Sequence, residues 1–256
     1  MEQVKFGLIG YPLGHSFSKQ YYDAKIFQQE VSGVSYELFP LPHMDQFPVL
    51  LQENPDLKGV NVTIPHKITV LDYVDQCSPE AQEIGAVNCI QIRRIAGQAP
   101  FLMGYNTDVY GFQMSLQPLL QTHHRQALVL GNGGAAKAVC FALDQLGIQW
   151  RVVSRKPLVE NGQLAYGELD RELMAEHLLI VNTTPLGTFP EVNSLAPIPY
   201  EFLTARHLLY DLVYNPSETA FLKKGLEVGA TIKNGYDMLV LQAERNWEIW
   251  MEGLAL

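Results

Sequence analysis

The sequence predicts an α/β fold divided into two domains. Short runs of β-branched residues alternate with longer stretches of helical periodicity, which is the pattern of βαβ units. A predicted hairpin interrupts that rhythm before residue 105, which indicates a different first domain. A glycine-rich turn follows a strand later in the chain, and 256 residues are enough for two modest domains.

The composition excludes several classes of protein. With 47% hydrophobic and 18% charged residues and no biased tract, the chain is globular and not disordered, collagenous or coiled-coil. A net charge of −9 repels phosphate backbones and anionic membranes, so we expect neither nucleic acid nor membrane as a partner. Cys77, Cys89 and Cys140 have no C-x-x-C spacing, which argues against a disulfide framework. No signal peptide pattern or run of about 18 apolar residues occurs, so we expect a cytoplasmic protein.

Nine runs have the composition of strands and are bounded by turn residues or helical patterns. The segment A-G-Q-A-P separates the fourth run from residues 101–104, and this spacing predicts the hairpin. The nine predicted strands are residues 4–9, 35–41, 59–62, 87–93, 127–130, 150–153, 178–181, 208–211 and 230–233.

Two helices are predicted at the places where the chain changes domain. Apolar residues recur at helical spacing over 108–120, and Thr107 with Asp108 offers an N-cap, so we place the first boundary near Thr107. A second amphipathic helix over 236–251 begins just after Gly235. From its residues alone, this last helix fits against either domain.

The run A-L-V-L-G-N-G-G-A-A-K predicts a strand over 127–130, a glycine turn, and a helix over 135–146. Gly131 allows the tight turn, Gly133 lets the backbone approach a pyrophosphate, and Ala136 permits close packing of helix on strand. A tight turn without ligand is the alternative. Strand, loop and helix in this order favour dinucleotide binding.

The next strand of the unit ends at Ser154, followed by Arg155 and Lys156. An acid here would bind the ribose diol of NAD, whereas arginine accepts the 2′-phosphate of NADP. Cations therefore favour NADP. The alternative is that both are solvated cations at a strand end.

Three polar clusters lie just beyond predicted strands, where open α/β sheets bind ligands. They cover residues 14–19, 61–67, and 86–88 together with 104–108, and they offer donors and acceptors suited to a polyhydroxylated substrate. For any single residue, turn formation or capping is the alternative.

Several motifs together make the chain recognisable. They are G-Y-P-L-G-H-S-F-S, N-V-T-I-P-H-K, G-A-V-N, G-Y-N-T-D, G-N-G-G-A-A-K, N-T-T-P-L-G, D-L-V-Y-N-P and N-G-Y-D-M-L-V-L-Q-A. With these motifs, the sequence resembles the shikimate dehydrogenases over nearly its whole length. The resemblance implies reversible NADPH-dependent reduction of 3-dehydroshikimate to shikimate in aromatic amino acid biosynthesis. It implies a substrate-binding domain over 1–106 completed by the last helix, 236–256, a Rossmann-like NADP-binding domain over 107–235, and a cleft between them.

The resemblance also assigns roles to individual residues. It implies that Lys67 and Asp108 are the catalytic pair and that Ser16 and Ser18 bind the substrate carboxylate. The remaining implied substrate contacts are Asn61, Thr63, Asn88, Tyr214 and Gln242. The implied cofactor contacts are Gly131, Asn132, Gly133, Gly134, Ala135, Ser154, Arg155, Lys156, Thr183, Leu212, Gly235 and Met238.

The chemistry of the pair agrees with this role. Hydride reduction of a ketone creates alkoxide charge that needs a positive proton donor, which Lys67 can be. Asp108 can hold both the ammonium and a substrate hydroxyl. Pairing with Lys67 would make the Asp108 carboxylate a poorer base, so the residues leave open whether Lys67 or Asp108 accepts the proton. Without the resemblance, Lys67 reads as a solvated lysine and Asp108 as an N-cap. The seven histidines show no metal-ligand pattern, so no metal is expected.

Two departures from the family pattern concern Lys19, where proline commonly follows S-x-S, and Ser154-Arg155-Lys156, which replaces Asn-Arg-Thr. One competing reading is a quinate/shikimate dehydrogenase with relaxed choice of substrate or cofactor. Another is a dinucleotide-binding regulatory module without catalysis, against which Lys67 and Asp108 argue. We expect a monomer or homodimer.

Overall fold

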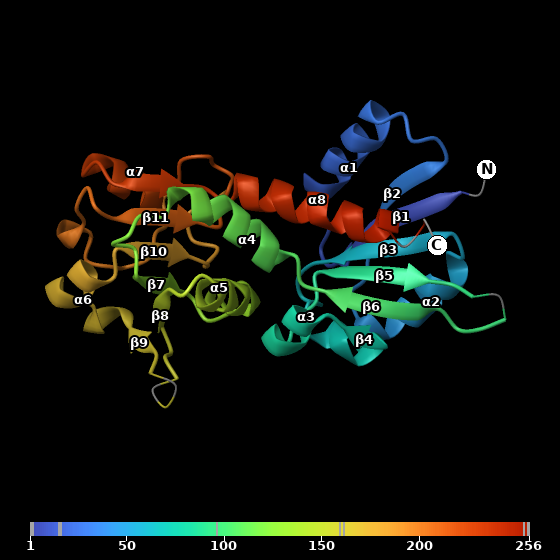
Figure 1. Ribbon diagram of the computed structural model, residues 1–256, viewed down its shortest axis with the longest axis horizontal. Helices are drawn as coiled ribbons and strands as arrows, with labels where there is room; N and C mark the ends of the chain where they lie inside the picture. The colour runs from blue at the N-terminus through green and yellow to red at the C-terminus, as the bar shows by residue number, and fades with distance from the viewer. Residues whose placement is uncertain are drawn as a thin grey trace. The chain divides into compact units, whose positions relative to one another are not determined.

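The computed structural model describes residues 3–14, 17–95, 97–158, 160, 162–252 and 254. These residues form two compact units, each with its own sheet (Figure 1). The first unit consists of Met1–Thr107 with Ala243–Leu256, and the second of Asp108–Gln242. The α/β class predicted from the sequence is confirmed.

The first unit has a six-stranded mixed sheet in the order β2-β1-β3-β5-β6-β4. The first three strands in this order are parallel, whereas β5 is antiparallel to both β3 and β6. The β5–β6 pairing confirms the predicted hairpin. The strands are β1 (Val4–Gly10), β2 (Val34–Pro40), β3 (Leu57–Val62), β4 (Gln76–Cys77), β5 (Cys89–Arg93) and β6 (Phe101–Tyr105).

The helices of the first unit are α1 (Phe17–Gln28), α2 (Phe47–Glu53) and α3 (Pro79–Ile84), with the end of α8 (Tyr236–Glu252). The indole of Trp250 in α8 stacks on Phe6 of β1, with ring centroids 4.7 Å apart. Its Nε1 donates to the carbonyl oxygen of Ile90. A Cβ on Gly59 of β3 would come within 2.3 Å of this indole, so glycine is required for the helix to lie against the sheet. The last helix therefore contributes core to the first unit.

The second unit has a six-stranded parallel sheet in the order β12-β11-β10-β7-β8-β9. This is the strand order of a dinucleotide-binding sheet. Successive strands are added on one side of β7 up to β9, and from β10 onward they are added on its other side. The strands are β7 (Gln126–Leu130), β8 (Gln149–Ser154), β9 (Leu164–Ala165), β10 (Leu179–Asn182), β11 (Leu208–Asp211) and β12 (Thr231–Lys233).

Helix α5 packs on β7 and β8, and α7 packs on β11 and β12. A core of aliphatic residues from the strands, including Leu128, Ile180 and Leu209, meets Phe221 and Leu222 of α7. The helices of this unit are α4 (Asp108–Leu116), α5 (Gly134–Gln145), α6 (Arg171–Glu176), α7 (Ala220–Glu227) and the first turns of α8.

The expected helix over 108–120 ends earlier than predicted. It stops at Leu116 and continues as a 3₁₀ turn over Gln117–Leu119, because Pro118 lacks the N–H that the next α-helical turn requires. The division between the units falls inside α8, after Gln242, and not before it. No helix within the described ranges is both long and apolar enough to span a membrane.

Candidate functional site

Three of the predicted site residues lie together in the first unit. Asn61 pairs in register with Cys89, the neighbour of Asn88, where β3 meets β5. The N–H of Val62 donates to the carbonyl of Asn88 at 2.8 Å, and the N–H of Val87 donates to the carbonyl of Lys67 at 2.7 Å. These backbone bonds bring Asn61, Lys67 and Asn88 to one edge of the sheet. The Lys67 side chain is half-buried there.

Thr63 joins the same edge from the end of β3. Its N–H donates to the carbonyl of Ile9 at 2.9 Å, and its methyl group would lie 2.4 Å from a Cβ on Gly10. Gly10 therefore leaves the space that Thr63 occupies. The ends of β1 and β3 are therefore closely packed at Gly10 and Thr63.

A buried tyrosine connects two further predicted residues. The hydroxyl of Tyr36 donates to Oδ1 of Asn61 at 2.8 Å, and Ser18 hydrogen-bonds to the same hydroxyl. Tyr36 is fully buried, and this burial raises the pKa of its phenol well above the usual value. Ser18 lies in α1, while Ser16 falls outside the described residues.

Asn88 is held by the turn between β6 and α4. Its Oδ1 accepts the backbone N–H of Thr107 at 2.7 Å, and its Nδ2 donates to the Thr107 hydroxyl at 3.0 Å. Both side chains are buried. The Thr107 hydroxyl therefore lies between the side chains of Asn88 and Asn246, whose Oδ1 is 2.6 Å away.

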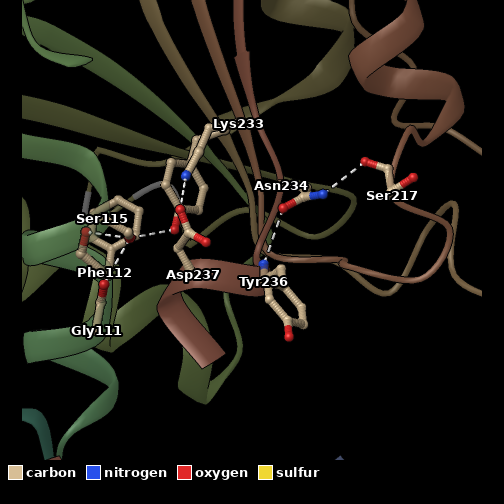
Figure 2. A network of polar contacts seen from close by, with 9 residues as sticks. Gly111, Phe112, Ser115, Ser217, Lys233, Asn234, Tyr236 and Asp237 are labelled. Carbon is tan, nitrogen blue, oxygen red and sulfur yellow. Dashed lines mark hydrogen bonds and ion pairs between the residues drawn. The ribbon is translucent and has the colours of Figure 1, made fainter. Parts of the chain in front are cut away.

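In the second unit, α4 contacts the first turns of α8, because a Cβ on Gly111 would meet Met238 and Gln242. Figure 2 shows a network of polar contacts in this region. Ser115 of α4 lies 2.7 Å from the hydroxyl of Tyr210 in β11, and Lys233 forms an ion pair with Asp237 at the start of α8. The side chain of Asn234 donates to the carbonyl of Ser217 and accepts the N–H of Tyr236, which shapes the turn into α8.

Three predicted substrate-side residues belong to this part of the second unit. Asp108 is the half-buried first residue of α4, where its carboxylate is favourably placed in the helix dipole. Gln242 is buried, and its Nε2 donates to the carbonyl of Leu239 within α8 at 2.9 Å. Tyr214 follows β11 and is 38% exposed, with partial burial raising the pKa of its phenol.

The glycine turn has the geometry that dinucleotide binding requires. Gly131 has φ +107°, and a Cβ there would lie 2.8 Å from the hydroxyl oxygen of Thr183, so only glycine fits. Gly133 precedes α5 without any side-chain cap, and nothing lies within 4 Å of where its Cβ would be. The first turn of α5 contains no acid. The helix start therefore has open space and uncapped N–H groups for an anion.

A cavity of about 500 Å³ opens at this turn, at the carboxyl ends of β7, β8 and β10. It contains six predicted cofactor residues, namely Gly131, Asn132, Gly133, Ser154, Arg155 and Thr183. It also contains residues that we did not predict, namely Tyr166, Thr184, Pro185, Leu186, Leu195 and Pro197. Three of these belong to the N-T-T-P-L-G motif and two follow soon after it in the chain, whereas nothing in the sequence pattern marks Tyr166.

The three residues predicted to select the cofactor, at the end of β8, differ in burial and in whether they line the cavity. Ser154 is buried, with the side chain of Asn132 3.5 Å from its hydroxyl. Arg155 is exposed and lines the cavity, while Lys156 is exposed and is not among the described residues lining it. Of the predicted cofactor residues, Gly134 and Ala135 begin α5 behind the glycine turn.

The other three predicted cofactor residues form a separate group around the start of α8. A Cβ on Gly235 would lie 2.1 Å from the carbonyl oxygen of Leu212, and Leu212 is hydrogen-bonded to Asn182. The carbonyl of Met238 would lie 2.5 Å from a Cβ on Gly111 of α4. Both glycines therefore allow backbone contacts that a side chain would prevent.

A buried acid supports the loop that lines the cavity. Asp211 accepts hydrogen bonds from Asn182 Nδ2 at 2.9 Å, the Val213 N–H at 3.0 Å and the Thr219 hydroxyl at 2.6 Å. Asn182 Oδ1 in turn accepts from the N–H and the hydroxyl of Thr184. Burial raises the pKa of Asp211 to about 6 despite these hydrogen bonds. Within the described ranges, no cluster of three or more His, Cys, Asp or Glu has the arrangement of a metal site.

Comparisons with known proteins agree with this geometry. Residues 8–90 match the family model described as the shikimate dehydrogenase substrate binding domain. A shikimate dehydrogenase (NADP(+)) of Caldanaerobacter subterraneus subsp. tengcongensis is 37% identical over 259 residues, which cover 96% of this chain and 90% of that protein. The chain belongs to the shikimate dehydrogenase family.

Two solved structures share the fold across both units. Shikimate 5-dehydrogenase from Thermus thermophilus, in complex with NADP(H) and shikimate, is 34% identical with a TM-score of 0.82, covering 97% of this chain and 93% of that one. The ligand-free 5-ketofructose reductase of Gluconobacter sp. strain CHM43 has the same TM-score at 26% identity, covering 98% and 93%. The family fold therefore also serves an enzyme named for a different polyhydroxylated ketone.

Proposed function

We propose that this protein is an NADP-dependent shikimate dehydrogenase that reversibly reduces 3-dehydroshikimate to shikimate in aromatic amino acid biosynthesis. One observation carries the proposal: this member of the family has both the glycine-turn cavity and the polar sheet edge that includes Lys67. The cavity fits a dinucleotide because it combines an open helix start at Gly133 with a cation at Arg155. Bound NADPH supplies the hydride.

For the substrate, we assign binding to the polar groups at the sheet edge and to residues of the second unit. Ser16 and Ser18 bind the carboxylate, and Asn61, Thr63 and Asn88 bind the hydroxyl-bearing side. Tyr214 and Gln242 complete the set. Alcohols and amides suit a polyhydroxylated ring because they both donate and accept hydrogen bonds.

For the chemistry, we assign the proton transfer to Lys67 with Asp108. The Lys67 ammonium donates a proton to the carbonyl oxygen as hydride adds to the carbon, and becomes a neutral amine. In the reverse direction this neutral amine takes the proton of the alcohol. Asp108 orients the ammonium and a substrate hydroxyl. We further assign the two units the substrate-binding and cofactor-binding roles, and we propose a cytoplasmic monomer or homodimer.

The proposal is tested by mixing the protein with NADP and shikimate and following the absorbance of reduced nicotinamide. Turnover with shikimate is expected, and parallel assays with quinate and with NAD separate the relaxed quinate/shikimate dehydrogenase. Binding of NADP without turnover of either substrate would instead support a regulatory module.

The Lys67→Ala variant is the sharper test of the site. We expect turnover to fall roughly 10²- to 10⁴-fold, because the proton donor is lost, while binding of shikimate changes much less. Steady-state kinetics with a shikimate titration separate the two effects. Near-normal turnover in Lys67→Ala would remove this lysine from the mechanism.

A further inference from the structure

Four buried polar side chains form a continuous hydrogen-bonded chain in the first unit, ending at a proposed substrate contact. They are Tyr22 of α1, Asn246 of α8, Thr107 in the turn before α4, and Asn88 before β5. Exposed fractions are 0% for Tyr22 and Asn246, and 3% for Thr107 and Asn88. Side chains this buried require hydrogen-bonded partners, and here they supply them to one another.

The direction of each hydrogen bond follows from the one before it. The Tyr22 hydroxyl donates its single proton to the carbonyl oxygen of Ala243 at 2.9 Å, because a carbonyl can only accept. Its oxygen is therefore the acceptor in the hydrogen bond with the Asn246 side chain. This orients Nδ2 of Asn246 toward Tyr22 and Oδ1 of Asn246 toward Thr107.

The same reasoning carries the order to Asn88. The Thr107 hydroxyl lies 2.6 Å from Oδ1 of Asn246 and donates its proton there, in preference to Oδ1 of Asn88 at 3.2 Å. Its oxygen is then able to accept from Nδ2 of Asn88 at 3.0 Å. The backbone N–H of Thr107 donates to Oδ1 of Asn88, which excludes the flipped amide.

We infer that Thr107 and Asn246 are positioning residues that set the orientation of the Asn88 amide for the substrate. The inference rests on the proposed function, which assigns Asn88 to the hydroxyl-bearing side of the substrate. Thr107 and Asn246 act through Asn88 and need not touch the substrate. A fixed amide presents its donor and acceptor in one arrangement, so less ordering remains to be done when the substrate binds.

The decisive variant is Thr107→Val, which keeps the shape and the backbone N–H but removes the hydroxyl. We expect the KM for shikimate to rise about 10- to 100-fold, the range for losing hydrogen bonds of this kind, with kcat changed much less. The KM for NADP should stay the same. Thr107→Ser restores the hydroxyl and should restore the KM.

A double-mutant cycle separates positioning from general loss of structure. If Thr107 acts through Asn88, Thr107→Val should add little to the KM effect of Asn88→Ala. Ser78→Ala is the matched control, because Ser78 is a buried hydroxyl of the same unit that caps α3 through the Ala81 N–H. It should lower the melting temperature without changing the KM for shikimate.

Several results would overturn the inference. These are an unchanged KM in Thr107→Val, additive effects in the cycle, or equal rises in the KM values for shikimate and NADP with a lowered melting temperature. If Thr107→Val does not fold, Asn246→Ala measured in the same way decides, and an unchanged KM there also overturns it. Absence of shikimate turnover in the wild-type protein would instead contradict the proposed function, and this result is distinguishable from those that overturn the positioning role.

Discussion

Arg155 is the residue through which the second unit would distinguish its cofactors. It lines the glycine-turn cavity next to Ser154, while Lys156 is not among the described lining residues. A charge-assisted hydrogen bond to the 2′-phosphate would contribute about 1.5 to 3 kcal/mol. Arg155→Ala should therefore weaken the binding of NADP by this amount and leave the binding of NAD nearly unchanged, as measured by titration of each cofactor. Lys156→Ala is the control and should have a smaller effect; equal loss of both cofactors in Arg155→Ala would contradict the phosphate role.

The raised pKa of Asp211 predicts that the stability of the protein depends on pH. Its pKa is raised to about 6 by burial, so the folded protein holds this proton over a range where the unfolded chain has released it. Its contribution to stability is full below about pH 4 and is lost as pH rises through about 6. The loss is at most about 3 kcal/mol at roughly 1.36 kcal/mol per pKa unit.

The comparison with Asp211→Asn isolates this contribution from other titrating groups. The difference in free energy of unfolding, wild type minus variant, should fall between about pH 4 and about pH 8, because the variant has no charge to bury. Urea unfolding at both pH values measures it. A difference that does not change with pH would show that Asp211 has the same pKa in both states.

At the scale of elements, Gly111 sets how closely α4 and α8 approach within the second unit. Alanine normally favours a helix interior by up to about 1 kcal/mol over glycine. Here its Cβ would lie 2.5 Å from the carbonyl oxygen of Met238 and 3.1 Å from Cβ of Gln242, so the helices would have to move apart. Overpacking of this kind costs about 1 to 3 kcal/mol.

Gly111→Ala should therefore lower the free energy of unfolding, despite the better helix propensity. Chemical denaturation measures the change. Gly167→Ala is the control, since nothing lies within 4 Å of its Cβ position, and it should be close to neutral. A stabilised Gly111→Ala protein would contradict this prediction, because α8 would then move away from α4 without loss of stability.

At the scale of the whole molecule, the chain passes between its two units at only two places, after Thr107 and after Gln242. Hydride transfer requires both ligands to meet in one reactive geometry. We therefore predict that NADP and shikimate together protect residues 106–111 and 235–242 from hydrogen exchange more than either ligand alone. Mass spectrometry of the exchanged peptides measures this. Strictly additive or absent protection in these two segments would contradict a closing movement on ligand binding, while leaving the dehydrogenase assignment intact.

The most predictable elements were those whose local patterns agree with their tertiary surroundings. The strands at residues 127–130 and 208–211 are apolar runs beside turn residues, and both are present. The sequence predicted no range for five helices, α1, α2, α3, α6 and α7, and did not predict the two-residue strands β4 and β9. Strands this short are defined by pairing with a distant partner, so local sequence carries little signal for them.

The sequence by itself determined the family, the α/β class and the glycine turn, because the turn needs particular residue types at consecutive positions. Gly131 has a left-handed backbone and no room for a Cβ, and that requirement is visible in the letters. Only the tertiary structure decided which buried side chains support the site. Thr107 and Asn246 are 139 residues apart in the chain, and Tyr36 and Asn61 are 25 apart. Their hydrogen bonds exist because packing places them together out of water, where an unpaired polar group is costly and its orientation becomes fixed.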